Sequence, residues 1–222
     1  MDVWFGTVIR AAPVQRGGSL VKLDWDRKRV VREVPIVPSE PALDHDPNER
    51  GNVRGCRGIQ VVGDEVVAAD YHTLQIFDHD LNPVRRLSHG QMVGLHEIQA
   101  VDGSMWVTAT TLDAALRFDM ASGALEAEFW PREMPAFQQA LDVEPLAVNK
   151  QADNRAAYLA GETFRGPSHL HLNAICEFRG ETYDYFSHPY NTSWRNERTV
   201  EVPLARRAIE RRAGSRVLEI GN

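Results

Sequence analysis

Two neighbouring segments repeat one pattern at a spacing of about 40 residues, and this repeat constrains the fold more than any other feature. Ile59-Gln60 in the first segment corresponds to Ile98-Gln99 in the second. Phe77-Asp78 corresponds in the same way to Phe118-Asp119. Short apolar runs alternate in both segments with turn pairs such as Asp102-Gly103, which favour tight hairpins. Each segment therefore predicts four short strands.

A period near 40 residues that carries four strands is typical of a β-propeller blade. Such a sheet has two apolar faces and buries both by stacking on its neighbours. The alternative is a sandwich built from two unrelated antiparallel hairpins. We expect a mainly β fold, namely an incomplete or oligomer-completed β-propeller with four-stranded blades, followed by a C-terminal α-helix and a short strand.

The repeat divides the chain into a propeller-like domain, residues 1–175, and a tail, residues 178–222. The expected blades cover about 1–36, 58–88 and 94–131, with a degenerate blade at 140–178. Three strands are expected in the first blade, which suits a blade without its first strand. Residues 37–57 are rich in proline, glycine and charge and predict a surface loop.

Regular structure is harder to place after Pro131. Pro135–Leu141 predicts a helical turn. We expect two strands of the degenerate blade at Leu146–Val148 and Ala156–Leu159, with Asp153-Asn154 as a turn. A further ordered stretch is expected from His171 onward.

Composition excludes several classes of function. The net charge of −6, without a long basic run, argues against a nucleic-acid partner. No apolar run reaches the ~18 residues of a membrane span, so no membrane partner is expected. Two cysteines, Cys56 and Cys176, and an N-terminus unlike a signal peptide predict a cytoplasmic protein.

The blade alignment brings three polar residues to equivalent positions. Arg57, His96 and Asn173 each fall at the start of the first strand of a blade. First strands line the centre of a propeller, so these side chains are expected to converge in one polar pocket with His171. His169 and His171 would share a face of a strand, which is the spacing of a chelating pair. A solvated loop is favoured over a metal site for Asp44-His45-Asp46, and no metal is expected overall.

Residues 1–175 resemble bacterial propeller proteins of uncharacterised function. The resemblance is carried by GLHEIQAVDGSMWVTATTLDAALRFD, which begins at Gly94, and by HLNAI, which begins at His171. It implies a stack of blades, and a complete propeller would need more blades than this chain contains. Exposed strand edges of an open ring are rarely left bare, so a homo-oligomer that closes the propeller is expected.

The C-terminal tail resembles the beginning of a class I S-adenosylmethionine-dependent methyltransferase. The matching segments are WRNER from Trp194, VEVP from Val200 and LEIG from Leu218. The resemblance implies that Glu219 and Gly221 belong to the motif that binds S-adenosylmethionine. The sequence ends at Asn222, before the rest of the glycine-rich turn and its helix, and one parallel strand cannot form a sheet alone. The segment is therefore interpreted as part of a longer fusion or as a helix docked on the β-domain.

These observations favour a soluble propeller-like module that binds a small molecule or a protein and needs no cofactor. No P-loop, CxxC or Ser-His-Asp order is present in the sequence. A methyltransferase that is present as an N-terminal fragment, with S-adenosylmethionine as cofactor, is the first alternative. A propeller lyase or hydrolase, with His96 as general base and Arg57 stabilising an anion, is the second.

Overall fold

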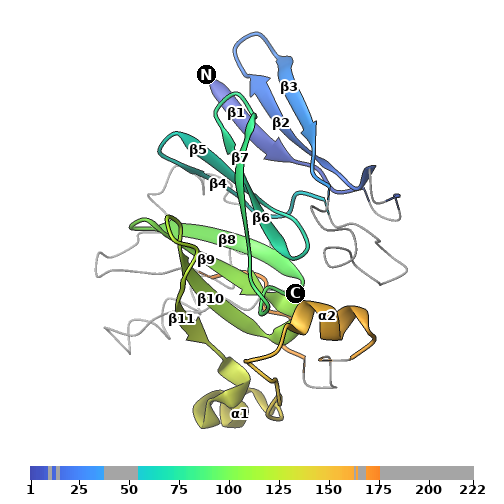
Figure 1. Ribbon diagram of the computed structural model, residues 1–222, viewed down its shortest axis with the longest axis vertical. Coiled ribbons are helices and arrows are strands. Elements are labelled where there is room, and N and C mark those ends of the chain that lie inside the picture. Colours follow the sequence, from blue (N-terminus) through green and yellow to red (C-terminus); the bar gives the residue numbers. More distant parts are fainter. Residues whose placement is uncertain (10–11, 14–15, 38–54, 163, 165–168, 176–222) are drawn as a thin grey trace, which may run out of the picture. The chain divides into compact units, whose positions relative to one another are not determined.

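The computed structural model describes residues 1–9, 12–13, 16–37, 55–162, 164 and 169–175. Their strands form three successive antiparallel sheets, each built from one continuous stretch of chain (Figure 1). Sheet 1 contains β1 (Asp2–Gly6), β2 (Ser19–Asp24) and β3 (Arg29–Pro35). Sheet 2 contains β4 (Ile59–Val62), β5 (Glu65–Ala69), β6 (Thr73–Asp78) and β7 (Pro83–Ser88). Sheet 3 contains β8 (Leu95–Val101), β9 (Ser104–Ala109), β10 (Ala114–Asp119) and β11 (Leu125–Phe129).

The turn chemistry read from the sequence produces the hairpins. Asp102 and Gly103 join β8 to β9 with φ values of 48° and 79°. Two consecutive residues with positive φ are required by the tight turn that matches strand twist, and an Asp-Gly pair tolerates this conformation. The expected four-stranded repeat is confirmed in sheets 2 and 3.

The three sheets share one further turn, which ends the third strand of the repeat. An aspartate closes β2, β6 and β10, and its Oδ1 atom accepts a backbone N–H of the following hairpin in each case; these residues are Asp24, Asp78 and Asp119. Hydrogen bonds donated by the side chains of Arg27, Asn82 and Ser122 hold the pKa of the three carboxyls, respectively, below its ordinary value. The sheets are therefore copies of one unit.

A β-bulge supports the same equivalence. The register shifts just before the closing aspartate in all three sheets, between Lys22 and Leu23, between Ile76 and Phe77, and between Arg117 and Phe118. This alignment makes β2 equivalent to β6 and β10. Sheet 1 thus consists of the second, third and fourth strands of the unit, and the described residues contain no strand of this sheet that corresponds to β4 and β8.

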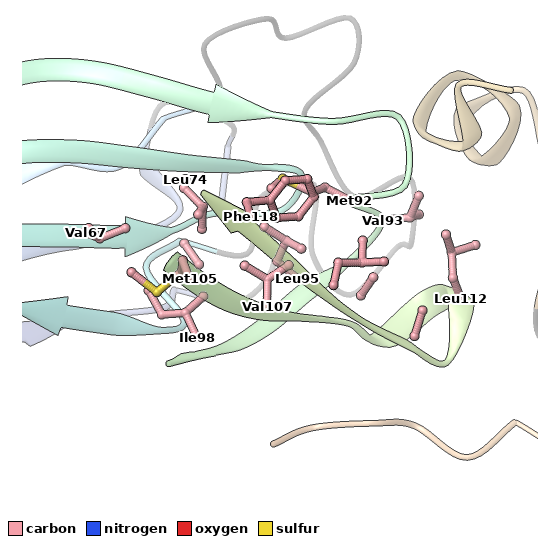
Figure 2. Close-up of a cluster of buried hydrophobic side chains, with 14 of the residues drawn as sticks. Val67, Leu74, Met92, Val93, Leu95, Ile98, Met105, Val107, Leu112 and Phe118 are labelled. Atoms are coloured by element: carbon pink, nitrogen blue, oxygen red, sulfur yellow. The ribbon is translucent and has the colours of Figure 1, made fainter. Parts of the chain in front are cut away.

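Apolar clusters join consecutive sheets. The larger cluster lies between sheets 2 and 3 and includes Val67 and Leu74 on one side and Met105, Val107 and Phe118 on the other (Figure 2). A second cluster joins sheets 1 and 2 through Leu20, Val66, Ala68 and Phe77. Sheets that bury both faces against like sheets are the arrangement of propeller blades. The predicted fold class, a mainly β stack that is not closed within the described residues, is confirmed.

The chain after sheet 3 differs from the prediction. Pro135–Leu141 forms a helix, α1, as expected, but Ala156–Leu159 belongs to a second helix, α2 (Asn154–Leu159), and is not a strand. Asp153 caps α2 by accepting the backbone N–H of Arg155, and two alanines follow, which favours a helix over an extended segment. Leu146–Val148 is not a strand either. The predicted degenerate blade therefore has no strand in its described part.

The predicted C-terminal helix and strand, and the tail at 178–222, lie outside the described residues, and the domain boundary at 175–178 remains a prediction. Within the part of the chain that the structure describes, none of the helices has the length and apolar character needed to span a membrane.

The cluster between sheets 2 and 3 generates a stability prediction. The Phe118 side chain is fully buried in it, so Phe118→Ala is expected to lower the free energy of unfolding by about 3–5 kcal/mol, because the truncation loses apolar burial and leaves a cavity. Urea unfolding followed by circular dichroism measures this change. Val84→Ala on the exposed side of β7 is the control, with an expected change below about 1 kcal/mol. Equal changes in the two variants would contradict the packing.

Candidate functional site

The first strands of sheets 2 and 3 approach each other closely where both begin. A Cβ atom on Gly58 would lie 3.1 Å from the backbone oxygen of His96 and 3.0 Å from the Ile98 side chain, so glycine favours this close approach. Arg57 precedes Gly58 and donates its backbone N–H to Ala69 at 2.9 Å, which extends the pairing of β4 with β5. Arg57 and His96 therefore begin neighbouring first strands, as the alignment of the repeats predicted.

A β-bulge displaces the start of β8. The register of β8 against β9 shifts between Leu95 and Ile98, so His96 and Glu97 leave the regular ladder. The Thr108 hydroxyl replaces the missing ladder contacts, since it accepts the Glu97 backbone N–H at 2.9 Å and donates to the Glu97 backbone oxygen at 3.3 Å. Bulges of this kind redirect side chains and are common beside functional sites.

A buried carboxylate, Asp113, fixes residues 169–171 against sheet 3. Asp113 lies between the 3-10 turn Thr110–Leu112 and β10, and its side chain is fully buried. It accepts the backbone N–H groups of Leu170 and His171, both at 2.9 Å. Two cationic or polar side chains complete its surroundings: Arg132 Nη1 at 3.4 Å and His169 Nε2 at 3.3 Å. A buried charge is tolerated only with such partners.

Residues 169–171 carry two histidines toward His96. His171 has a φ of 57°, in the left-handed region that a non-glycine residue occupies rarely and mainly where its surroundings hold it there. The ring of His171 lies edge-on to the rings of His96 and His169, with centroid distances of 6.2 and 5.4 Å. His169 Nε2 is also 2.7 Å from the Thr110 backbone oxygen. We call His96, His169 and His171 the imidazole cluster.

The structure brings together part of the predicted site. His96 and His171 are neighbours, and Asn173 follows within the same segment, its backbone oxygen 3.4 Å from the Thr108 hydroxyl. The prediction that His169 and His171 lie on a strand is wrong, because the Asp113 contacts hold His171 in a left-handed conformation instead. Ligand binding by Arg57, His96, His171 and Asn173 remains a prediction.

Three other predicted positions lie outside the described residues. These are the loop Asp44-His45-Asp46 and the two residues assigned to S-adenosylmethionine, Glu219 and Gly221.

The imidazole cluster is half-buried, so a ligand can reach it. Burial raises the pKa of the neighbouring Glu97 carboxyl above its ordinary value. Among the residues that the structure describes, no three histidine, cysteine or acidic side chains are arranged to hold a metal ion. Neutral imidazoles act both as donors and as acceptors, so the arrangement suits hydrogen bonding to a polar ligand.

Sequence reasoning missed Asp113 and Arg132. An aspartate in a short connection between strands usually indicates a solvated turn. One signal was present: sheet 2 also buries an aspartate, Asp70, between its second and third strands, where it accepts the Gln75 side chain at 2.6 Å. Asp70 directly follows β5 whereas Asp113 directly precedes β10, so the two repeats share a buried aspartate in this connection but not its position or its partners.

Comparison with known proteins identifies no family: no family model and no curated protein matches the chain. Solved structures with partial likeness include the Pan2 WD40 domain of Neurospora crassa, with a TM-score of 0.42 and 13% identity over 58% of this chain and 34% of that one. Saccharomyces cerevisiae Sqt1 gives 0.41 and 7% over 56% and 35%. Myxococcus xanthus glutaminyl cyclase gives 0.38 and 14% over 66% and 60%. The chain thus spans only about a third of the first two structures and 60% of the third. The assignment of the fold rests on the internal repeats.

The Asp113 contacts generate a prediction for stability. Asp113→Ala is expected to lower the free energy of unfolding by about 3–5 kcal/mol, because Arg132 and two backbone N–H groups lose their buried acceptor. Asp142→Ala is a matched control, since Asp142 has nearly the same φ, 51° against 50°, but is exposed. Chemical unfolding compares the two variants. A loss no greater for Asp113 than for Asp142 would contradict the proposed role of the carboxylate.

Glu97 generates a prediction for pH dependence. Its folded-state pKa is raised, so the protonated carboxyl favours the folded state; this contribution is complete below the unfolded pKa and is lost as pH rises through the folded pKa. Glu97→Gln removes the ionisation. The variant is therefore expected to gain stability relative to the parent between about pH 4 and pH 7. Urea unfolding across this range measures the gain, and a stability difference that stays constant with pH would contradict the burial of this carboxyl.

Proposed function

We propose that this chain is a ligand-binding module of β-propeller type and that its ligand binds at the imidazole cluster. One observation carries the proposal: three departures from regular backbone meet at this point. They are the bulge at His96 and Glu97, the left-handed residue Asp113 and the left-handed residue His171. Backbone strain is retained where the surrounding contacts hold it, and it gathers at functional sites.

The ligand is a small polar molecule or a polar segment of a protein. The cluster is half-buried, and the threonines beside it, Thr108 and Thr110, already bond to the protein's own backbone. We assign the ligand contacts to the three imidazoles, which are half-buried and lie ring against ring. Arg57 begins the neighbouring first strand, and we propose that its side chain supplies a cation to the ligand. A ligand that carries hydroxyl, carboxylate or phosphate groups fits these donors and acceptors.

Imidazole-detected NMR tests the proposal. A library of small polar compounds that includes inorganic phosphate, citrate and glucose is added to the full chain. A binding compound is expected to shift the resonances of His96, His169 and His171 together, because the three rings are in contact. His96→Ala is expected to weaken binding at least tenfold, a loss of about 1.4 kcal/mol. The control is His79→Ala, whose ring packs on Trp4 between sheets 1 and 2.

Three outcomes decide between this proposal and its alternatives. If no compound shifts the three histidines, or if His96→Ala binds like the parent chain, the proposal fails. If turnover of a bound compound is observed and lost in His96→Ala while binding persists, the lyase or hydrolase alternative is favoured. Calorimetry with S-adenosylmethionine addresses the other alternative: no saturable heat is expected, and one saturable site per chain would support the methyltransferase fragment.

A further inference from the structure

One ring of the imidazole cluster has a hydrogen position that its contacts determine. The Nε2 atom of His169 lies 2.7 Å from the backbone oxygen of Thr110 and 3.3 Å from Oδ1 of Asp113. A carbonyl oxygen only accepts hydrogen bonds, so Nε2 carries a hydrogen and donates it to the protein itself. His169 therefore positions the other two rings of the cluster, those of His96 and His171.

His96 and His171 come from segments that are far apart in the sequence. His96 lies in the bulge of β8, and the backbone N–H of the left-handed His171 is held by Asp113 at 2.9 Å. Their rings are half-buried and lie edge-on at a centroid distance of 6.2 Å. An imidazole that takes up a proton gains a positive charge and becomes a donor at both ring nitrogens. This pair can therefore add positive charge to the site.

The fixed charges around the cluster balance one another in the part of the chain that the structure describes. Arg132 lies 3.4 Å from the buried Asp113 carboxyl. Arg57 donates its backbone N–H to Ala69, which directly precedes Asp70. Two arginines thus accompany two aspartates, and they leave no excess positive charge for an anion. The ionisable residues on the surrounding elements are Arg57 before β4, Asp70, Tyr71 and His72 between β5 and β6, Glu97 in β8, Asp113 before β10 and Arg132 after sheet 3.

The other ionisable groups on these elements supply no positive charge either. His72 is fully buried, and its Nδ1 accepts the backbone N–H of Gly94 at 3.3 Å, so this ring is neutral. Burial raises the pKa of the Glu97 carboxyl, which means that its surroundings disfavour an uncompensated negative charge. An anion bound beside Glu97 therefore needs a positive charge that the fixed groups do not provide.

We propose that the ligand of the imidazole cluster is a small oxyanion, with a carboxylate or phosphate group, and that it binds together with a proton taken up by His96 or His171. This inference rests on the proposed function, because it requires the cluster to be the binding site. The proton supplies the charge that balances the anion. The N–H groups of the protonated ring then donate charge-assisted hydrogen bonds to the oxygen atoms of the ligand.

Proton uptake determines the sign of the pH dependence. A bound anion favours the charged form of a neighbouring imidazole and raises its pKa, and by reciprocity the protonated imidazole binds the anion more tightly. The affinity is highest below the pKa of the free site and is lost as pH rises through the pKa of the complex. We expect the affinity for an anion to fall at least tenfold between about pH 6 and pH 8.

Calorimetric titration of the full chain tests the proposal. Sulfate represents a phosphate group and tartrate a carboxylate, because both keep a constant charge between about pH 6 and pH 8. Glucose and choline are the neutral and cationic probes. Each probe is titrated at both pH values, in two buffers that differ in heat of ionisation, so that the protons taken up are counted. We expect sulfate or tartrate to bind at least tenfold more tightly at the lower pH, with uptake of up to about one proton per anion. The tighter of the two anions identifies the group that the site prefers.

A double variant assigns the proton to the two rings. His96→Gln/His171→Asn keeps a side-chain N–H donor at both positions but cannot take up a proton there, and asparagine tolerates the left-handed conformation of residue 171. Its affinity for the anion is expected to be weak and equal at both pH values. His79→Gln is the matched control, since His79 is also half-buried but packs on Trp4, and it is expected to keep the pH dependence of the parent chain.

NMR titration of the histidine rings in the parent chain gives a measurement without any variant. Saturating anion is expected to raise the pKa of His96 or His171 by at least about one unit, which corresponds to the tenfold change in affinity. The resonances of His79 are expected to stay unchanged by the anion. Circular dichroism verifies that the double variant is folded, and the NMR titration decides if it is not.

The results that overturn the proposal differ from those that overturn the proposed function. If anions shift the resonances of His96 and His171 but bind equally at both pH values, or if glucose or choline binds there as tightly, the cluster is a binding site whose ligand is not a proton-coupled anion. If the double variant keeps the pH dependence, or His79→Gln loses it, the proton is taken up elsewhere and the inference fails. If no probe shifts the histidines of the cluster, the proposed function fails as well.

Discussion

The packing of each sheet against the next is the interaction on which the rest of the structure depends. A four-stranded sheet of this unit buries side chains on both of its faces, as β5 and β9 show by their almost complete burial. Neither face can be satisfied within the sheet, so the sheets are stable only in contact. The cluster between sheets 2 and 3 also sets the distance between β4 and β8, and Gly58 allows that distance to be short. The place where the first strands converge is thus a consequence of core packing.

The imidazole cluster depends in turn on a buried charge. Asp113 is surrounded by donors from two directions: Arg132 from the chain after sheet 3, and the segment of His169, Leu170 and His171. Removal of a carboxylate from water is costly, and only this complete set of donors offsets the cost. The same contacts that satisfy the charge determine where the His171 ring points. The contacts that stabilise the buried charge of Asp113 are therefore also the contacts that fix the geometry of the imidazole cluster.

The described stack is asymmetric at its ends. Beyond sheet 3, the segment 169–173 bonds to the hydroxyls of β9 and of the turn that follows it, so the polar side of this sheet is occupied by the chain itself. Within the described residues, sheet 1 has no counterpart of the first strand of the unit, and Phe5 and Val30 in this sheet are exposed.

The sequence by itself determined the repeat, the hairpin turns and the equivalence of Arg57 and His96, because these depend on local spacing and on residues with strong turn preferences. It also indicated that His96, His171 and Asn173 belong to one region. It failed at Ala156–Leu159, where the helix cap at Asp153 and the alanines outweigh a weak strand pattern. Only the tertiary structure decided that Asp113 is buried and that His171 is left-handed, since the donors of Asp113 lie 57 and 58 residues away along the chain. A contact between residues so far apart in the sequence leaves no local sequence pattern, so it can be recognised only in the packed structure.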